Sequence, residues 1–386
     1  MLEQSRNAIE KLHLAFKEKK ISLYLGAGVS IGSNLPAWDK LVLAMYFSTM
    51  SEQYLGGWRP FSNYLYAIAE WQLANNPEPL EITARKLRKY YSPENDEQIF
   101  RDNLYQTLYG SLIDREGNPL PDINRDFLRQ NNLTLNAVAR LCESDQRGVH
   151  TVISYNYDNI LEIALGNFNF QSVYSSNSLV SGKLPIYHVH GFVPLDRNEP
   201  GSKGTDIVFT EDQYHRVAGN PYFWSNLVQL QAMANSVGLM IGLSLSDRNM
   251  RRLLDAVQNA PVQSGNYALL KIPDETPPDN QILDEIHEKA IKYLEKFEKS
   301  GIKWDDEARD SVFFAKPGVK SARSVILSPR MGEKGPLYRH EIAGIMEQVQ
   351  KVNREQQDYV LKQLGVTPIW FNNYSDIPAI IDMILA

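Results

Sequence analysis

The sequence predicts an α/β fold: a parallel β-sheet with helices on both faces, a helical insertion and a mainly helical C-terminal elaboration. The first observation is that short apolar segments typical of strands alternate with helical patterns along much of the chain. The second is that these segments become polar only after their carboxyl ends, as expected of parallel strands buried on both faces. With 386 residues and 43% apolar side chains, the chain can bury such a core.

The first strand and the loop after it carry the clearest single signal for a ligand. Residues 21–25 are mostly apolar and lead into Gly26-Ala27-Gly28-Val29-Ser30, with Pro36 downstream. In a Rossmann-like sheet, paired glycines after a strand allow a tight turn and a close approach of a pyrophosphate to free backbone N–H groups. With the next glycine at Gly32, the spacing is G-x-G-x-x-x-G rather than the G-x-G-x-x-G of dehydrogenases. Alone, the loop fits a plain tight turn equally well.

The remaining elements follow in order along the chain. We expect further strands at residues 149–154, 185–189, 206–209, 237–241, 266–272 and 367–371. We expect helices at residues 1–20, 36–50, 64–73, 82–91, 133–142, 282–298 and 339–364, and around residues 160–164 and 250–257. Another helix starts at Thr210 or Asp212, and Ser375-Asp376 caps the closing helix.

These elements predict a single domain over residues 1–386 that contains two insertions. Its core comprises about residues 1–50, 133–272 and 365–386. Residues 51–132 form a helical insertion rich in aromatic side chains, and residues 273–364 form a mainly helical one, within which residues 305–336 show no clear pattern. Because the core accounts for the ligand site, we expect assembly and control to reside in the insertions.

Composition excludes several classes of function. The net charge of −6 argues against a broad basic surface, so no direct sequence-specific nucleic-acid binding is expected. Cys142 is the single cysteine, which rules out an intramolecular disulfide and a four-cysteine zinc site and favours a reducing, cytoplasmic location. Residues 1–20 are amphipathic rather than a signal peptide, and no apolar run reaches the roughly 18 residues of a membrane span.

Polar clusters follow four of the predicted strands. They are the glycine loop with Ser30, Asn156 with Asp158, His190 with Gly191, and the segment from Gly242 that holds Ser244, Asp247 and Asn249. Because the carboxyl ends of parallel strands share one edge of a sheet, and ligands bind at that edge, the four clusters together predict a site. Their joint placement is more specific than any one of them.

In this order the motifs resemble those of the sirtuin family of NAD-consuming enzymes. That family has a G-A-G-x-S loop with a downstream proline, then N-x-D, H-G and G-x-S. The matching segments here are Gly26-Ala27-Gly28-Val29-Ser30 with Pro36, Asn156-Tyr157-Asp158, His190-Gly191 and Gly242-Leu243-Ser244. The resemblance implies that NAD⁺ is the substrate. The residues predicted to bind it are Gly26, Ala27, Gly28, Ser30, Pro36, Gly242, Ser244 and Asp247.

Two departures indicate the branch of the family. Family deacylases carry a four-cysteine zinc module between H-G and G-x-S, which a chain with one cysteine cannot build, so no metal is expected. The sequence around Asn156, His190 and Gly242 resembles that of bacterial sirtuin-like proteins of anti-phage defence, which hydrolyse NAD⁺. That resemblance implies an NAD-depleting effector of abortive infection. It also implies a homo-oligomer that works with a HerA-type P-loop ATPase, a nuclease-like protein or another defence partner.

The chemistry of NAD⁺ hydrolysis suits the predicted residues. Nicotinamide leaves as a neutral group from a cationic ring, so the reaction needs no general acid but does need a stabilised oxocarbenium-like centre and a positioned water. The resemblance gives this work to Asn156, which holds a water or a ribose hydroxyl, and to His190, which accepts a proton. Asp158 is our addition to the catalytic set: it supplies negative charge or orients the nicotinamide amide, or else it simply caps the following helix.

Structural alternatives stand beside these assignments. Ser244 and Asp247 also fit a turn and a helix cap, and Ser30 also fits a turn cap. His188 and His190 are two apart on a predicted strand and would share a face, but no spacing indicates a third metal ligand.

Functional alternatives also remain open. One is a regulatory subunit that binds NAD⁺ or ADP-ribose without chemistry. Another is a zinc-free protein deacylase or ADP-ribosyltransferase. A nucleic-acid-processing enzyme is disfavoured, because no cluster of metal-binding carboxylates and no basic aromatic tract is present.

Overall fold

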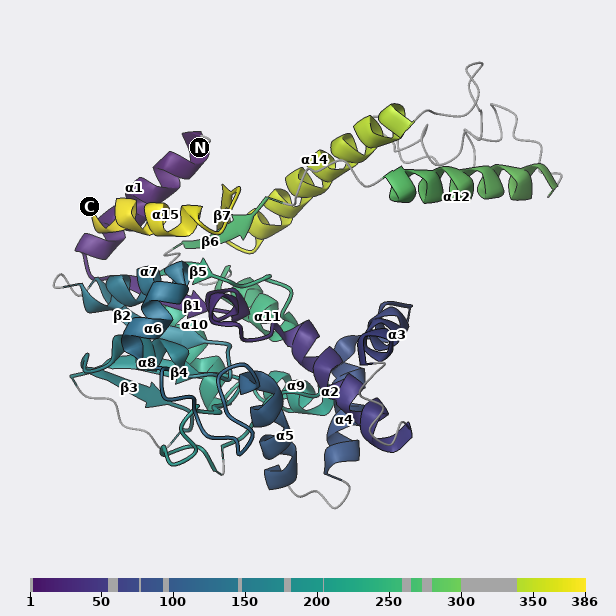
Figure 1. The fold of residues 1–386 in the computed structure, drawn as a ribbon. Helices are drawn as coiled ribbons and strands as arrows, with labels where there is room; N and C mark the ends of the chain where they lie inside the picture. Colours follow the sequence, from purple (N-terminus) through teal and green to yellow (C-terminus); the bar gives the residue numbers. More distant parts are fainter. Residues whose placement is uncertain are drawn as a thin grey trace. The chain divides into compact units, whose positions relative to one another are not determined.

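In the computed structural model, the chain folds into helices and strands (Figure 1). The structure describes residues 3–54, 62–75, 78–92, 97–144, 148–176, 182–203, 205–258, 265–272, 280–299 and 339–386. The chain divides into two compact units, one of residues 1–272 with 358–386 and one of residues 273–357. The first unit contains all the residues predicted to form the site.

A seven-stranded sheet in which every pairing is parallel organises the first unit. Its strands are β1 (Ile21–Leu25), β2 (Val149–Ser154), β3 (Phe170–Val173), β4 (Leu184–His188), β5 (Val237–Ile241), β6 (Asn266–Lys271) and β7 (Val366–Phe371). Their order in the sheet is β3-β4-β2-β1-β5-β6-β7. The predicted α/β class, a Rossmann-like parallel sheet with helices, is therefore confirmed.

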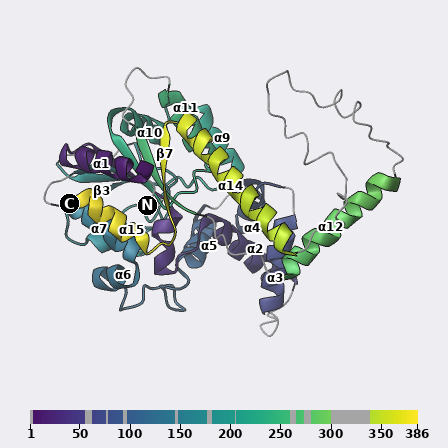
Figure 2. The same cartoon turned by 90° about the horizontal axis from the view of Figure 1, so that it is seen from above.

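Helices bury both faces of this sheet, as the apolar strands require. The helices of the unit are α1 (Glu3–Lys17), α2 (Trp38–Tyr54), α3 (Ser62–Asn75), α4 (Leu80–Tyr91), α5 (Glu97–Tyr109), α6 (Arg125–Asn131), α7 (Leu133–Glu143), α8 (Ile160–Leu165), α9 (Glu211–Gly219), α10 (Trp224–Asn235), α11 (Arg248–Gln258) and α15 (Asp376–Leu385). Along β1, Leu23 and Leu25 enter the core that holds α1, α7, α8 and α15, while Tyr24 enters the core that holds α10 and α11. In Figure 2, β7 lies between α15 and α11.

Two strand predictions differ from the structure. The predicted strand at residues 206–209 is wrong, because these residues pair with no strand of the sheet. Val208 N donates instead to His190 O at 2.7 Å, and Phe209 N donates to Gln213 Oε1 at 2.9 Å, so the turn after β4 and the start of α9 use these backbone groups. The edge strand β3 was not predicted, since its four residues include the polar Gln171 and Ser172 and lack a continuous apolar pattern.

The helices of residues 51–132 pack onto the same core as the sheet. Phe100 and Leu104 of α5 and Leu87 of α4 are buried in the core that also holds β1. In this segment α3, α4, α5 and α6 are helical, and two helical turns, η1 (Ala27–Val29) and η2 (Ile31–Ser33), precede α2. Whether the segment is an insertion into an ancestral domain stays a prediction.

The second unit is described through its helical parts. It holds α12 (Asn280–Lys299) and most of α14 (Arg339–Gln363), and the patternless residues 305–336 lie outside the described residues. None of the helices in the described parts of the chain combines the length and apolar character that crossing a bilayer requires.

Candidate functional site

The four predicted polar clusters emerge side by side at one edge of the sheet. The strands that precede them, β4, β2, β1 and β5, are consecutive in the sheet order. Their last residues are in register: Leu25 pairs with Ser154 and with Ile241, and Ser154 pairs with His188. Each cluster therefore starts at the same level, where α/β sheets bind ligands.

The glycine loop is bound to the end of β5. Gly26 N donates to Ile241 O and Gly28 N donates to Gly242 O, both at 3.0 Å. A Cβ at Gly26 would lie 2.5 Å from Gly242 O, and one at Gly28 would lie 2.6 Å from Gly242 Cα. Gly242 itself has a φ of +70°, in the left-handed region that favours glycine. These glycines allow two backbones to approach each other closely.

This geometry corrects one expectation about the loop. The N–H groups of Gly26, Gly28, Val29 and Ser30 all donate to backbone carbonyls, so none of these four is free for a phosphate. The loop is a tight turn locked against β5, and its Ala27 and Gly28 are partly exposed. That Gly26, Ala27 and Gly28 contact a nucleotide stays a prediction.

Asn156, Ser30 and Asp158 form one hydrogen-bonded chain across two strand ends. Asn156 Nδ2 donates to Gly26 O at 3.1 Å and to Ser30 Oγ at 3.0 Å, and Ser30 Oγ donates to Asp158 Oδ2 at 2.9 Å. Asp158 Oδ1 also accepts from Ile160 N at 3.2 Å at the start of α8. Asp158, which precedes the N-cap residue Asn159, therefore binds the first N–H of α8 and fixes Ser30 at once. Burial raises the pKa of Asp158 to about 6, against the opposing effect of the Ser30 hydrogen bond.

His190 lies in the turn after β4, enclosed by aromatic side chains. Its ring meets Tyr155 edge-on, with centroids 5.1 Å apart, and Tyr214 with centroids 5.4 Å apart. His190 Nε2 is 3.7 Å from Asp247 Oδ2. Burial lowers the pKa of His190 below its ordinary value of 6.5, and the Asp247 carboxylate partly opposes this. The imidazole is thus neutral at neutral pH and can accept a proton.

Asp247 also caps the helix that follows it. Its Oδ1 accepts from Met250 N at 2.6 Å, at the start of α11, while its Oδ2 faces His190. Ser244 is exposed and hydrogen bonds to Ser246 Oγ at 2.6 Å. Among the described residues, neither Ser244 nor the half-buried Pro36 is hydrogen bonded to Asn156 or His190. The structure thus joins Asp247 to His190 and leaves Ser244 and Pro36 apart.

His188 belongs to a different, buried network. Its Nε2 lies 2.7 Å from Glu162 Oε1, and its Nδ1 lies 3.3 Å from the carbonyl oxygen of Asn156. Burial by itself lowers the pKa of His188, but the Glu162 carboxylate and hydrogen bonds outweigh it, so the pKa is raised. The expectation that His188 and His190 share a strand face is wrong, because β4 ends at His188. Among the described residues, no three His, Cys, Asp or Glu side chains form a group that would hold a metal ion.

Sequence reasoning missed Glu162 and Tyr214. Glu162 is 7% exposed and accepts from Ser172 Oγ at 3.0 Å, and through His188 it supports the backbone of Asn156. The available signal was a single carboxylate within the apolar sequence Ile160-Leu161-Glu162-Ile163-Ala164-Leu165. Tyr214 gave no such signal, because its approach to His190 depends on the loop that joins β4 to α9.

Together, the parallel sheet and the polar groups at its carboxyl edge define an α/β protein with a candidate ligand site at that edge. Residues 150–294 match the family model described as a SIR2-like domain. The match supports the sirtuin-like family, and with it a use of NAD⁺. It includes Asn156, Asp158, His190 and the segment from Gly242 to Asp247, and it begins after the glycine loop. The search of curated proteins finds no match to the chain.

Proposed function

We propose that the protein is an NAD⁺ glycohydrolase that cleaves NAD⁺ to nicotinamide and ADP-ribose. The main support is that two sets of polar side chains lie at the same edge of the sheet. One is the hydrogen-bonded chain Asn156–Ser30–Asp158, and the other is the His190–Asp247 pair. The SIR2-like match over these residues supports NAD⁺ as the substrate. By the resemblance of the motifs, the activity serves as an NAD-depleting effector in bacterial anti-phage defence.

Asn156 is proposed to hold the reacting water or a ribose hydroxyl through its side-chain oxygen. Its Nδ2 is already committed to Gly26 O and Ser30 Oγ. Among the described residues Asn156 Oδ1 has no hydrogen-bond partner, so it is the atom that remains to accept from the substrate. Asp158 is a positioning residue, because its Oδ2 accepts from Ser30, which in turn binds Asn156, and its Oδ1 accepts from Ile160 N.

His190 is proposed to be the general base. The bond between C1′ of the ribose and the nicotinamide nitrogen breaks, and its electron pair leaves with neutral nicotinamide. The water oxygen forms the new bond to C1′, and one water proton passes to the neutral imidazole, which later releases it to solvent. Asp247 stabilises the imidazolium that forms, since its carboxylate lies 3.7 Å from His190 Nε2.

Product analysis separates this proposal from its alternatives. A regulatory subunit would bind NAD⁺ or ADP-ribose without consuming it. A deacylase would release O-acyl-ADP-ribose, and an ADP-ribosyltransferase would leave a modified protein. The lowered pKa of His190 favours a reaction over binding alone, because a neutral buried imidazole beside a carboxylate suits proton transfer.

We also propose, from the resemblance, that the chain assembles as a homo-oligomer and works with a defence partner such as a HerA-type ATPase. An effector that destroys NAD⁺ must stay inactive in a healthy host. Activity is therefore expected to depend on a trigger that the partner or an infecting phage supplies.

The test is NAD⁺ turnover by the purified full chain, alone and with the product of a neighbouring gene or a phage-infected lysate. Nicotinamide and free ADP-ribose should appear in equal amounts. His190→Gln should lower the rate by roughly 10²- to 10⁴-fold. His215→Gln, an exposed histidine on α9, should leave it unchanged. No nicotinamide release under any of these conditions, or equal rates for wild type and His190→Gln, would refute the proposal.

A further inference from the structure

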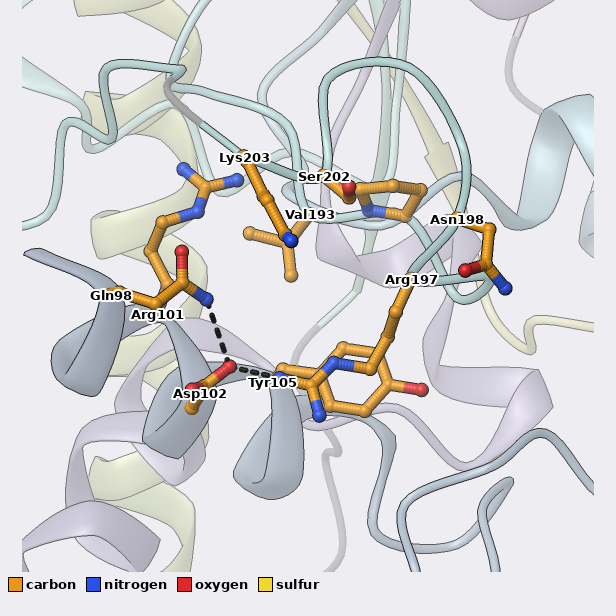
Figure 3. Close-up of a pocket in the computed structure, with 10 residues that line it drawn as sticks. Gln98, Arg101, Asp102, Tyr105, Val193, Arg197, Asn198, Ser202 and Lys203 are labelled. Atoms are coloured by element: carbon orange, nitrogen blue, oxygen red, sulfur yellow. Dashed lines mark hydrogen bonds and ion pairs between the residues drawn. The ribbon is translucent and has the colours of Figure 1, made fainter.

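A cavity of about 390 Å³ lies between α5 and the loop of residues 193–203 that follows β4 (Figure 3). Its volume falls in the usual range for small-molecule sites. None of the residues at the four strand ends predicted to bind NAD⁺ lines it. The cavity is therefore lined by residues other than those predicted to bind NAD⁺, and a ligand there does not require NAD⁺ hydrolysis at the sheet edge.

The inner wall of the cavity holds a buried guanidinium that lacks a carboxylate partner. Arg101 is 5% exposed. Its two terminal nitrogens donate to Thr205 O and Oγ1 at 2.7 and 2.8 Å, and to Phe192 O and Gly201 O at 2.8 and 3.3 Å. Among the described residues no carboxylate lies within ion-pair distance of Arg101, and its buried Nε has no hydrogen-bond partner. A buried charge of this kind is costly unless an anion compensates it.

Two further cations stand around the same cavity. Lys203 is exposed and forms no ion pair with any described residue. Arg197 pairs with Asp102, and its guanidinium lies 4.9 Å from the centre of the Tyr105 ring. Asp102, the one carboxylate among the residues that line the cavity, is thus already paired, and it also accepts from Gln98 Nε2 at 3.0 Å. The lining is positive in a chain whose net charge is −6.

We propose that this cavity binds a phosphate-bearing small molecule, with Arg101 and Lys203 as the groups that recognise the phosphate. Guanidinium and ammonium groups are the side chains that bind phosphate oxygens most strongly in proteins. Tyr105 is 3% exposed and the Arg197 guanidinium lies over its ring, so this ring offers no free face to a nucleobase. The ligand class is accordingly a sugar phosphate or a similar small phosphate ester.

The role of Arg101 in tying down the loop does not account for this arrangement. Its hydrogen bonds to Thr205, Phe192 and Gly201 satisfy the two terminal nitrogens with neutral acceptors. They leave Nε unpartnered among the described residues, and the carboxylates of Glu97 and Asp102 act on the guanidinium only from beyond ion-pair distance. They also give no reason for Lys203 to stand at the same cavity. A bound phosphate accounts for all three observations.

The test is calorimetric titration of the full chain at low ionic strength with inorganic phosphate, ribose 5-phosphate and ribose. Both phosphate-bearing probes should bind and ribose should not. Lys203→Gln should weaken binding by at least about tenfold, because its charge-assisted hydrogen bonds to phosphate are lost. Lys11→Gln, an exposed lysine on α1, should leave the affinity unchanged.

Three results would overturn the inference. In the first, neither phosphate probe binds at concentrations up to about 10 mM; a dissociation constant above this value is too weak for a specific site. Lys203→Gln, checked for an unchanged melting temperature, binds phosphate as wild type does, which would place the phosphate elsewhere. Ribose binds as well as ribose 5-phosphate, which would mean that the phosphate is not the group recognised.

Discussion

His190 and Asp247 come from two strand ends and meet at 3.7 Å in the folded protein. Asp247 was predicted as a nucleotide-binding residue with a helix cap as the alternative, and the structure shows the cap, through Met250 N, together with a contact to His190 that no spacing could reveal. A residue that serves two neighbours in this way is invisible to pattern analysis, since its second partner is 57 positions away in the sequence.

Asp247→Asn should move the acid limb of the activity profile to lower pH. The active form of His190 is neutral, so kcat/KM rises as pH increases through the pKa of His190, which burial holds below 6.5. Asp247 raises that pKa, so removing its charge lowers the pKa further, while the amide oxygen keeps the bond to Met250 N. Initial rates of nicotinamide release between about pH 5 and 8 measure the shift. Asp255→Asn, an exposed change on the same helix, should not move it; an unmoved limb in Asp247→Asn would contradict the assignment.

Asp158→Asn should have a higher free energy of unfolding than wild type, and this difference should increase as pH rises. The pKa of Asp158 is raised from 3.8 to about 6 in the folded chain, so ionisation costs stability progressively between these two pH values, and the full cost persists above pH 6. The shift corresponds to about 3 kcal/mol. Asparagine avoids this cost and can still bond to Ser30 and Ile160 N.

Denaturant unfolding at several pH values between 4 and 7 checks this difference. The gain of Asp158→Asn over wild type should grow with pH. Asp122→Asn, in an exposed turn, provides the comparison. If Asp158→Asn differs from wild type by the same amount at every pH, Asp158 is not a buried group whose pKa is raised by folding.

At the scale of elements, apolar patterns located most of the sheet. The strands at residues 149–154 and 237–241 have the predicted bounds, because β-branched residues mark the first and a continuous apolar run marks the second. Residues 207–209 are also apolar, but they are buried in a loop whose hydrogen bonds go to His190 O and Gln213. Burial alone produces an apolar run, so this pattern cannot tell a strand from a buried loop.

The glycine loop yields a prediction about stability. Because a Cβ at Gly28 would lie 2.6 Å from Gly242 Cα, Gly28→Ala should lower the free energy of unfolding by about 1–3 kcal/mol. Gly219→Ala meets open space at the end of α9 and should change the stability by less than about 0.5 kcal/mol or increase it slightly. Chemical denaturation of both variants measures the difference. Equal stabilities would show that the loop does not pack closely on the end of β5.

At the scale of the whole molecule, the sheet order determines which motifs meet. The sequence predicted four polar strand ends, but the neighbours of a strand in a parallel sheet do not follow from chain order. Here β4, β2, β1 and β5 are adjacent in the sheet, whereas β3, which precedes β4 in the chain, lies at the edge. The shared carboxyl edge of parallel strands predicted that the four motifs form one site, and the family resemblance added NAD⁺ as its ligand. Ser244 and Pro36 came with that resemblance, and their contact with NAD⁺ stays a prediction.

The most direct test of the central claim is an experimental structure of the His190→Gln protein with NAD⁺, in which slowed turnover preserves the substrate. We expect one NAD⁺ at the carboxyl edge of β4, β2, β1 and β5, with its nicotinamide ribose within hydrogen-bond distance of Asn156 Oδ1 and beside residue 190. NAD⁺ bound elsewhere, such as the cavity beside Arg101, or no NAD⁺ bound at saturating concentration, would contradict this account of the site.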